Sequence, residues 1–458
     1  MADACAEDLL SLDRDVARVA GLLARWRTDL ALDAARNPGV PSDLEDPFEV
    51  GRHVASKSTW DALLRLSVGP AEAMHRDALR RWVVSLMQAR IGLVFEVAMA
   101  RAREEPRGRL GGSAPRLVSF SEAWRGVLGA ETVGEAGEWL RAAADCAPAY
   151  ADLARRRAVR REVVAQRLGL DHPWSPLVAV TPAAMGAVAS EVLDATEDLW
   201  RYLIAETSGP GAAAVAVFRT AVARDRGEGW PSQVSLRWLT EVTGMAANGV
   251  EIEVPSLPAG LGAASFLRAL YAAGFAARVA LSRSGLPFSL AQEPLCVAGH
   301  RWALAFSSLG IDIGWQRRQL ELGSRVAAEH VRRLAHSALF ELRVLAARIL
   351  LGRAVATATD SLFEELCVRL FGLPLDIRLR GAWPSLRDDD PARLLAWLQA
   401  PSFIGELREG FDDDWYRNPR AWSRLRELAA RPAHEAVDPA RLDGQARGLA
   451  RAFEVALG

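Results

Sequence analysis

The chain has 458 residues, half of them hydrophobic, which is enough to bury a large core in one fold or in two closely fused subdomains. Its 56 basic and 57 acidic residues give a formal net charge of -1, and this balance argues against nucleic acid or an anionic membrane as the main partner. The four cysteines include no CxxC pair, so neither a zinc knuckle nor a disulfide framework is indicated, and a reducing compartment fits.

The N-terminus does not resemble a secretion signal. MADACAEDLLSLDRDVARVA carries acidic residues where a signal peptide has positive charge and an apolar core. Charged residues also interrupt apolar runs further along the chain, as Glu341, Arg343, Arg348 and Arg353 do in ALFELRVLAARILLGRAVA. We therefore expect no membrane-spanning segment and a cytoplasmic protein without a membrane partner.

The periodicity predicts helices almost throughout, so we expect a mainly α fold. Residues 1–170 form a predicted N-terminal helical lobe, because apolar residues recur at three- and four-residue spacing in its long segments. Residues 171–458 form a second predicted helical lobe, with helices at 265–281 and 298–310 and further helices toward the C-terminus. The best strand signal is GVEIEV at 249–254, whose alternation predicts at most a small β-element.

Conventional catalytic motifs are missing from the sequence. No two of the seven histidines stand at the i, i+4 spacing of an HExxH motif, and a three-histidine metal site would need distant segments. There is no GxSxG elbow, P-loop or kinase signature. The five arginines of ARRRAVRREVV at 154–164 are more typical of a solvated helix face than of a nucleic-acid site.

One predicted helix keeps a glycine among good helix formers. The segment SFLRALYAAGFAARVAL at 265–281 contains Gly274 near its middle, where glycine costs up to about 1 kcal/mol relative to alanine. Gly274 therefore either permits a close backbone approach or is left over from an altered active-site helix.

This segment resembles the active-site helix of the thimet oligopeptidase and oligoendopeptidase group, helical zinc peptidases of the gluzincin kind whose pattern is HExGHA. Laid on YAAGFA, the pattern puts Tyr271 and Phe275 at the two zinc histidines and Ala272 at the general-base glutamate, and it leaves Gly274 unchanged. The family's third ligand is a glutamate on the following helix. The matching position here is His300, 25 residues after Phe275, in VAGHRWALAFSSL.

A third segment extends the resemblance. DDDPARLLAWLQAPSFIGELREGFDDDWYRNPRAWSRLREL, which begins at residue 388, is similar to the family's closing helices, in which a YLRAW-like turn precedes a loop ending in W-W/Y-x-N-P. Arg393 stands where the tyrosine is expected, while Trp397, Trp415, Asn418 and Pro419 keep the pattern. The similarity covers roughly residues 170 to 430.

The resemblance implies a degenerate member of this superfamily, with a two-lobed helical fold that encloses a channel. Zinc in a peptidase needs three protein ligands and a base for its water. Tyr271 and Phe275 supply no imidazole nitrogen, Ala272 cannot act as a base, and His300 alone is too weak a site. The resemblance therefore implies no zinc, no cofactor and no peptide hydrolysis.

The predicted function is that of a pseudopeptidase, which acts by binding a peptide, a protein partner or a small ligand. Arg268 and Arg278, on the helix face of Tyr271 and Phe275, and Arg393 are the candidate channel-binding residues. Three alternatives stay open: a partner subunit of an active paralogous metallopeptidase, an enzyme with non-metal chemistry in the former active-site cavity, or a generic helical scaffold. The arginines could also only pair with nearby acidic side chains.

Overall fold

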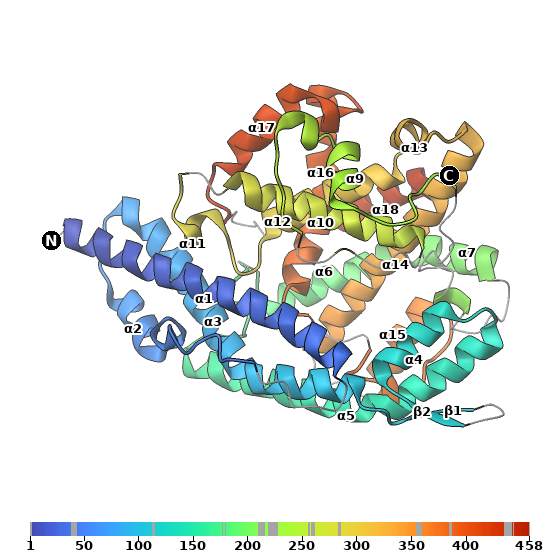
Figure 1. Ribbon diagram of the computed structural model, residues 1–458, viewed down its shortest axis with the longest axis horizontal. Helices are drawn as coiled ribbons and strands as arrows, with labels where there is room; N and C mark the ends of the chain where they lie inside the picture. Colours follow the sequence, from blue (N-terminus) through green and yellow to red (C-terminus); the bar gives the residue numbers. More distant parts are fainter. Residues whose placement is uncertain are drawn as a thin grey trace.

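The structure is a computed structural model that describes most of the chain. The described residues are 2–37, 44–111, 115–175, 177–178, 180–208, 216–218, 228–254, 257, 262–282, 285–353, 360–383, 387–434, 442 and 444–457. Helices form nearly all of this part of the chain (Figure 1), as the sequence predicted.

Long helices dominate the N-terminal third. Helix α1 packs against α3, and α3 packs against α5, so the three lie side by side along one edge of the molecule (Figure 1). The hydroxyl groups of Ser119 and Thr132 begin α4 and α5, because each accepts a hydrogen bond from a backbone N–H three residues on. The helices of this third are α1 (Ala2–Arg36), α2 (Lys57–Arg65), α3 (Pro70–Glu104), α4 (Phe120–Gly129) and α5 (Val133–Arg167), with a 3-10 turn at Arg52–Ala55.

In the remaining two thirds, α10 packs along α12, and α14, α16 and α17 pack against this pair. The helices of this part are α6 (Pro182–Ala195), α7 (Glu197–Ser208), α9 (Leu236–Val242), α10 (Ala263–Ser282), α11 (Phe288–Ala291), α12 (Val297–Ser307), α13 (Ile313–Gln319), α14 (Ser324–Arg353), α15 (Asp360–Phe371), α16 (Asp390–Phe411), α17 (Pro419–Ala429) and α18 (Gln445–Leu457). Short 3-10 turns lie at Ala246–Asn248, Ser308–Ile311, Ile377–Leu379 and Trp415–Arg417.

The segment 249–254, for which we predicted at most a small β-element, forms no strand. Val250 and Ile252 are buried while Glu251 and Glu253 are exposed, so the alternation that suggested a strand is real. Residues 250–254 nevertheless pair with no strand of the described chain, and the side chains on one side of this extended segment pack on the core. Within the described residues the sheet is instead a hairpin of β1 (Gly108–Leu110) and β2 (Arg116–Val118), which are antiparallel.

Hydrophobic packing joins the two predicted lobes, 1–170 and 171–458. The largest buried cluster among the described residues contains side chains of α4 and α5 together with side chains of α6, α14, α16 and α18. A second cluster is centred on α10 and α12, and a third on α1 and α3. The lobes therefore share a core, and their boundary at residue 170 stays a prediction.

Two helices are long and apolar enough to cross a membrane, although the sequence led us to expect none. They comprise residues Glu72–Glu104 of α3 and Ala263–Ser282, which is α10. By length and composition alone this is weak evidence, because the core helices of many proteins pass the same test. Helix α10 is such a core helix, since it packs along α12 and is buried over most of its length.

Candidate functional site

The candidate site is built on the close packing of α10 against α12. A methyl group at Gly274 would lie 2.8 Å from the backbone oxygen of Trp302 and 2.8 Å from Cδ2 of Phe306. Both distances are too short for a carbon contact, so the missing side chain is what lets the two helices approach. Of the two explanations for Gly274, the structure supplies the first: a close backbone approach.

This packing brings together three of the positions that the resemblance singled out. The hydroxyl oxygen of Tyr271 lies 2.6 Å from Nδ1 of His300. The ring of Phe275 lies against the same imidazole, with 5.2 Å between ring centroids. Ala272, on the same helix, is half-buried and has no group that could transfer a proton. Tyr271, Phe275 and His300 therefore form one cluster, which we call the aromatic plug.

The charge states in the aromatic plug follow from its burial. Burial lowers the pKa of His300 to about 4, and the nearby Arg393 adds to this effect while Asp389 opposes it. Burial also raises the pKa of Tyr271. The hydroxyl therefore stays protonated and the imidazole neutral, and we assign the hydrogen bond as donated by Tyr271 to Nδ1 of His300. Nε2 of His300 then faces Asp389, whose carboxylate lies 3.8 Å away.

The donor set of the aromatic plug does not fit zinc. A catalytic zinc site needs three nitrogen, sulfur or carboxylate ligands around one point, whereas Phe275 offers no donor atom and Nδ1 of His300 is already bonded to Tyr271. Within the described part of the chain, no group of three or more His, Cys, Asp or Glu side chains has an arrangement that could hold a metal ion. The residues at this place therefore do not fit a catalytic metal ion.

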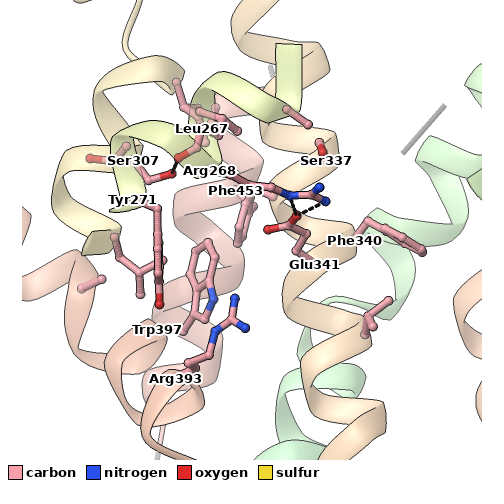
Figure 2. Close-up of a pocket in the computed structure, with 18 of the residues that line it drawn as sticks. Leu267, Arg268, Tyr271, Ser307, Ser337, Phe340, Glu341, Arg393, Trp397 and Phe453 are labelled. Atoms are coloured by element: carbon pink, nitrogen blue, oxygen red, sulfur yellow. Dashed lines mark hydrogen bonds and ion pairs between the residues drawn. The ribbon is translucent and has the colours of Figure 1, made fainter. Parts of the chain in front are cut away.

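A large cavity lies beside the aromatic plug. Its volume is about 1220 Å³, and Tyr271 forms part of its wall. Helices α4, α10, α12, α14, α16 and α18 enclose it. Figure 2 shows Tyr271, Arg393 and Trp397 on one side of this space and Phe340 and Glu341 on the other. Trp397 and Phe453 form an aromatic pair in the wall, with 5.9 Å between their ring centroids.

The three candidate arginines occupy different surroundings. Arg268 lines the cavity, but its guanidinium is bonded to Glu341 of α14 at 2.8 and 3.0 Å. Arg393 also lines the cavity, and its Cζ lies 5.6 Å from the centroid of the Tyr271 ring. Arg278 does not line it, which corrects our expectation: ten residues along a helix span about 15 Å, and Arg278 is buried where its charge acts on Cys296.

The residues of the predicted closing segment have structural contacts. The Trp415 ring packs on Phe306 of α12, with 5.1 Å between centroids. The Asn418 side chain accepts a hydrogen bond from the backbone N–H of Arg420 and so begins α17, with Pro419 at the first position of the helix. Through Trp415 this turn packs on α12, the helix that carries His300.

Sequence reasoning missed the acidic partners of the cavity. Glu341 of α14 and Asp389, which directly precedes α16, both line it. The run of aspartates at 388–390 before Pro391 was the available signal, since acidic residues followed by proline favour the start of a helix. That pattern marks a helix terminus, but it does not show which distant side chains the helix will face.

Comparisons with known proteins bear on the fold. No protein-family model matches the chain, and no curated protein matches its sequence. A solved structure described as that of an oligoendopeptidase F from Bacillus anthracis str. Ames is similar to it, with a TM-score of 0.59 and 12% identity over 89% of this chain and 84% of that chain. At this identity the likeness concerns the fold alone, and it confirms the predicted peptidase-like, mainly helical fold.

Proposed function

We propose that the protein is a pseudopeptidase, which binds a ligand in the cavity beside the aromatic plug and does not hydrolyse peptides. One observation carries this proposal. The helices that correspond by resemblance to an active-site pair are packed together, but Tyr271, Phe275 and His300 stand at the positions of the zinc ligands and form a cluster around the buried His300.

The chemistry of the cluster supports the absence of hydrolysis. A water molecule attacks a peptide bond only when a metal or a base activates it. Ala272 stands where the resemblance expects the base, and the neutral His300 ring is buried with its Nδ1 bonded to Tyr271. No group at this place is both basic and open to a substrate.

The size and lining of the cavity support binding. Ligand pockets usually measure about 300 to 1,000 Å³ and combine apolar walls with a few polar groups. This cavity, of about 1220 Å³, has aromatic side chains such as Trp397 and Phe340 next to charged ones such as Arg393. We propose a peptide or a small organic ligand as its occupant, in a protein that works in the cytoplasm.

The first experiment measures metal content and hydrolysis together. We expect desalted protein to contain no stoichiometric zinc by elemental analysis, and to leave a mixed library of fluorogenic peptides uncut with or without a chelator. About one zinc per chain, together with chelator-sensitive cleavage, would overturn the proposal, because the bound ion would need ligands that the aromatic plug does not provide.

A second candidate is an enzyme that uses the former active-site cavity for chemistry without a metal. The specific observation in its favour is the 2.6 Å contact between the Tyr271 hydroxyl, which lines the cavity, and His300, with Asp389 behind the imidazole. Such an arrangement can hold or pass a proton. Turnover of any substrate that is lost in Tyr271→Phe and kept in the surface variant Arg325→Gln would favour this candidate.

A further inference from the structure

Charged side chains gather at the end of the cavity nearest the aromatic plug. They come from α10, from α14, and from the start of α16 with the residues that precede it. Four arginines and two carboxylates line this end: Arg268, Arg348, Arg387, Arg393, Glu341 and Asp389. A third carboxylate, the fully buried Asp390, lies behind the wall and is bonded to Arg348. The arginines outnumber the carboxylates by one.

Two of the arginines are fully paired. Arg348 makes two hydrogen bonds to the buried carboxylate of Asp390, at 2.7 and 3.0 Å. Arg268 makes two bonds to Oε1 of Glu341. Glu341 and Asp390 are each already bonded to one arginine. Neither carboxylate can therefore hold a second guanidinium group in a bidentate geometry.

The other two arginines are paired less completely. Among the described residues, no ion pair of 4.0 Å or less joins Arg387 or Arg393 to a carboxylate. The Nε of Arg393 is a buried donor with no acceptor, while the same side chain forms a hydrogen bond with the Tyr271 hydroxyl. Enclosure by protein and the charges of Arg348 and Arg393 lower the pKa of Arg387, which is the effect expected of like charges held close together. Figure 2 shows Arg393 reaching from α16 into the cavity beside Trp397.

Resting on the proposed function that this cavity binds a ligand, we propose that the ligand is an organic monocarboxylate with an apolar or aromatic body. Its carboxylate lies between Arg393 and Arg387, whose planar guanidinium groups match a carboxylate by paired hydrogen bonds. Its body lies against the aromatic pair of Trp397 and Phe453. One negative charge balances the excess of one arginine, so the site favours a monoanion over a phosphate dianion.

The same chemistry occurs at the C-terminus of a peptide and in a free carboxylic acid. Calorimetric titrations with two matched probe pairs separate these sources: the peptide Ala-Ala-Phe against its C-terminal amide, and 3-phenylpropionate against its amide. Inorganic phosphate is the fifth probe. Arg393→Gln is the test variant. Arg408→Gln is the matched control, because Arg408 lines the same cavity but is paired with Asp312 at 2.8 Å.

We expect at least one acid to bind about tenfold or more tightly than its amide, a difference typical of lost charge-assisted hydrogen bonds. Arg393→Gln should remove that preference, while Arg408→Gln should keep it, and phosphate should bind more weakly than the acids. If both the peptide and the free acid bind, a carboxylate with an apolar group beside it is enough for recognition. If only one of them binds, that one shows whether the ligand is a peptide C-terminus or a free carboxylic acid.

Three results would overturn the carboxylate assignment. One is equal binding of acid and amide, the second is a preference for acid that Arg393→Gln leaves intact, and the third is that no acid binds at millimolar concentration. None of these results tests the proposed function itself. If acid and amide bind equally well and Trp397→Ala weakens the binding of both, a ligand still binds in the cavity. The proposed function fails separately, through zinc content with chelator-sensitive cleavage.

Discussion

Replacing Gly274 by alanine tests whether the close approach of α10 and α12 holds the candidate site together. The new methyl group would meet the Trp302 carbonyl oxygen at 2.8 Å and two atoms of Phe306 at 2.8 and 2.9 Å. Ordinary contacts begin at 3.4 Å, so the helices have to separate by about half an ångström at this point. The Trp302 oxygen belongs to the backbone of α12 and cannot turn aside as a flexible side chain would.

The magnitude follows from two opposing terms. Overpacking a well-packed core costs typically about 1 to 3 kcal/mol, while alanine favours the helix over glycine by about 1 kcal/mol. We therefore expect Gly274→Ala to lower the free energy of unfolding by up to about 2 kcal/mol. The variant should also weaken the hydrogen bond of Tyr271 to His300, because that bond crosses the same pair of helices.

Gly21→Ala provides the control. Gly21 lies inside α1, and a methyl group there would meet no atom within 4 Å. Only the higher helix propensity of alanine then counts, so we expect the free energy of unfolding of this variant to rise by up to about 1 kcal/mol. Denaturant titrations of both variants beside the native protein isolate the packing term as their difference. A Gly274→Ala protein that is stabilised as much as Gly21→Ala would refute the argument that close packing requires the glycine.

Three further predictions concern buried polar groups. Tyr271→Phe removes the donor to Nδ1 of His300, so we expect a loss of about 1 to 3 kcal/mol in unfolding free energy and an NMR-measured pKa of His300 above its native value of about 4. Burial likewise lowers the pKa of His172 and His336 from 6.5 to about 4. The unfolded chain then binds more protons, and stability present above pH 6.5 is lost as the pH falls toward 4. His336→Phe should reduce that loss, seen as a shift of the denaturant midpoint with pH, by up to about 3 kcal/mol. Arg348→Met leaves the buried Asp390 carboxylate unpaired and should cost about 3 to 5 kcal/mol, whereas Arg325→Met on the exposed face of α14 should change the midpoint little.

The helical fold was predictable because its signal is local. Apolar residues at helical spacing report which face of a segment is buried, whatever that face packs against. The meeting of Tyr271, Phe275 and His300 was also predictable, since Tyr271 and Phe275 share one face of α10 and the resemblance placed His300 opposite them. Hydrogen-bond and ring contacts now join the three residues in the structure.

The errors have physical causes that lie outside any local pattern. The segment 249–254 alternates as a strand does, but a strand also needs a neighbour to bond with, and the core covers it instead. Arg278 lies on the same face of α10 as Arg268, but the cavity does not extend along the helix as far as Arg278. A helical face predicts direction around the axis and gives no information on how far along the axis a cavity reaches.

The charge pairs of the cavity were the least predictable feature. Arg268 and Glu341 are 73 residues apart, and Arg348 and Asp390 are 42 apart. Which arginine meets which carboxylate depends on how α10, α14 and α16 converge, and only the folded chain fixes that. Arg387 and Arg393 follow from the same convergence, because Glu341 and Asp390 are bonded to other arginines, and Asp389 acts on Arg393 only through its charge.

The aromatic plug and the charged end of the cavity are neighbouring features with different roles in the proposed function. In a metallopeptidase the ion itself joins the ligand helices, and metal binding contributes to folding. Here the contacts that join α10 and α12 include the close packing of Gly274 against Phe306, the bond of Tyr271 to His300 and the bond of the Ser307 hydroxyl to the Leu267 carbonyl oxygen. In the function that we propose, packing of this kind would hold the two helices together in place of an ion. The proposed ligand would then be selected by groups with unfilled hydrogen bonds, and in the described cavity wall the Nε of Arg393 is such a donor.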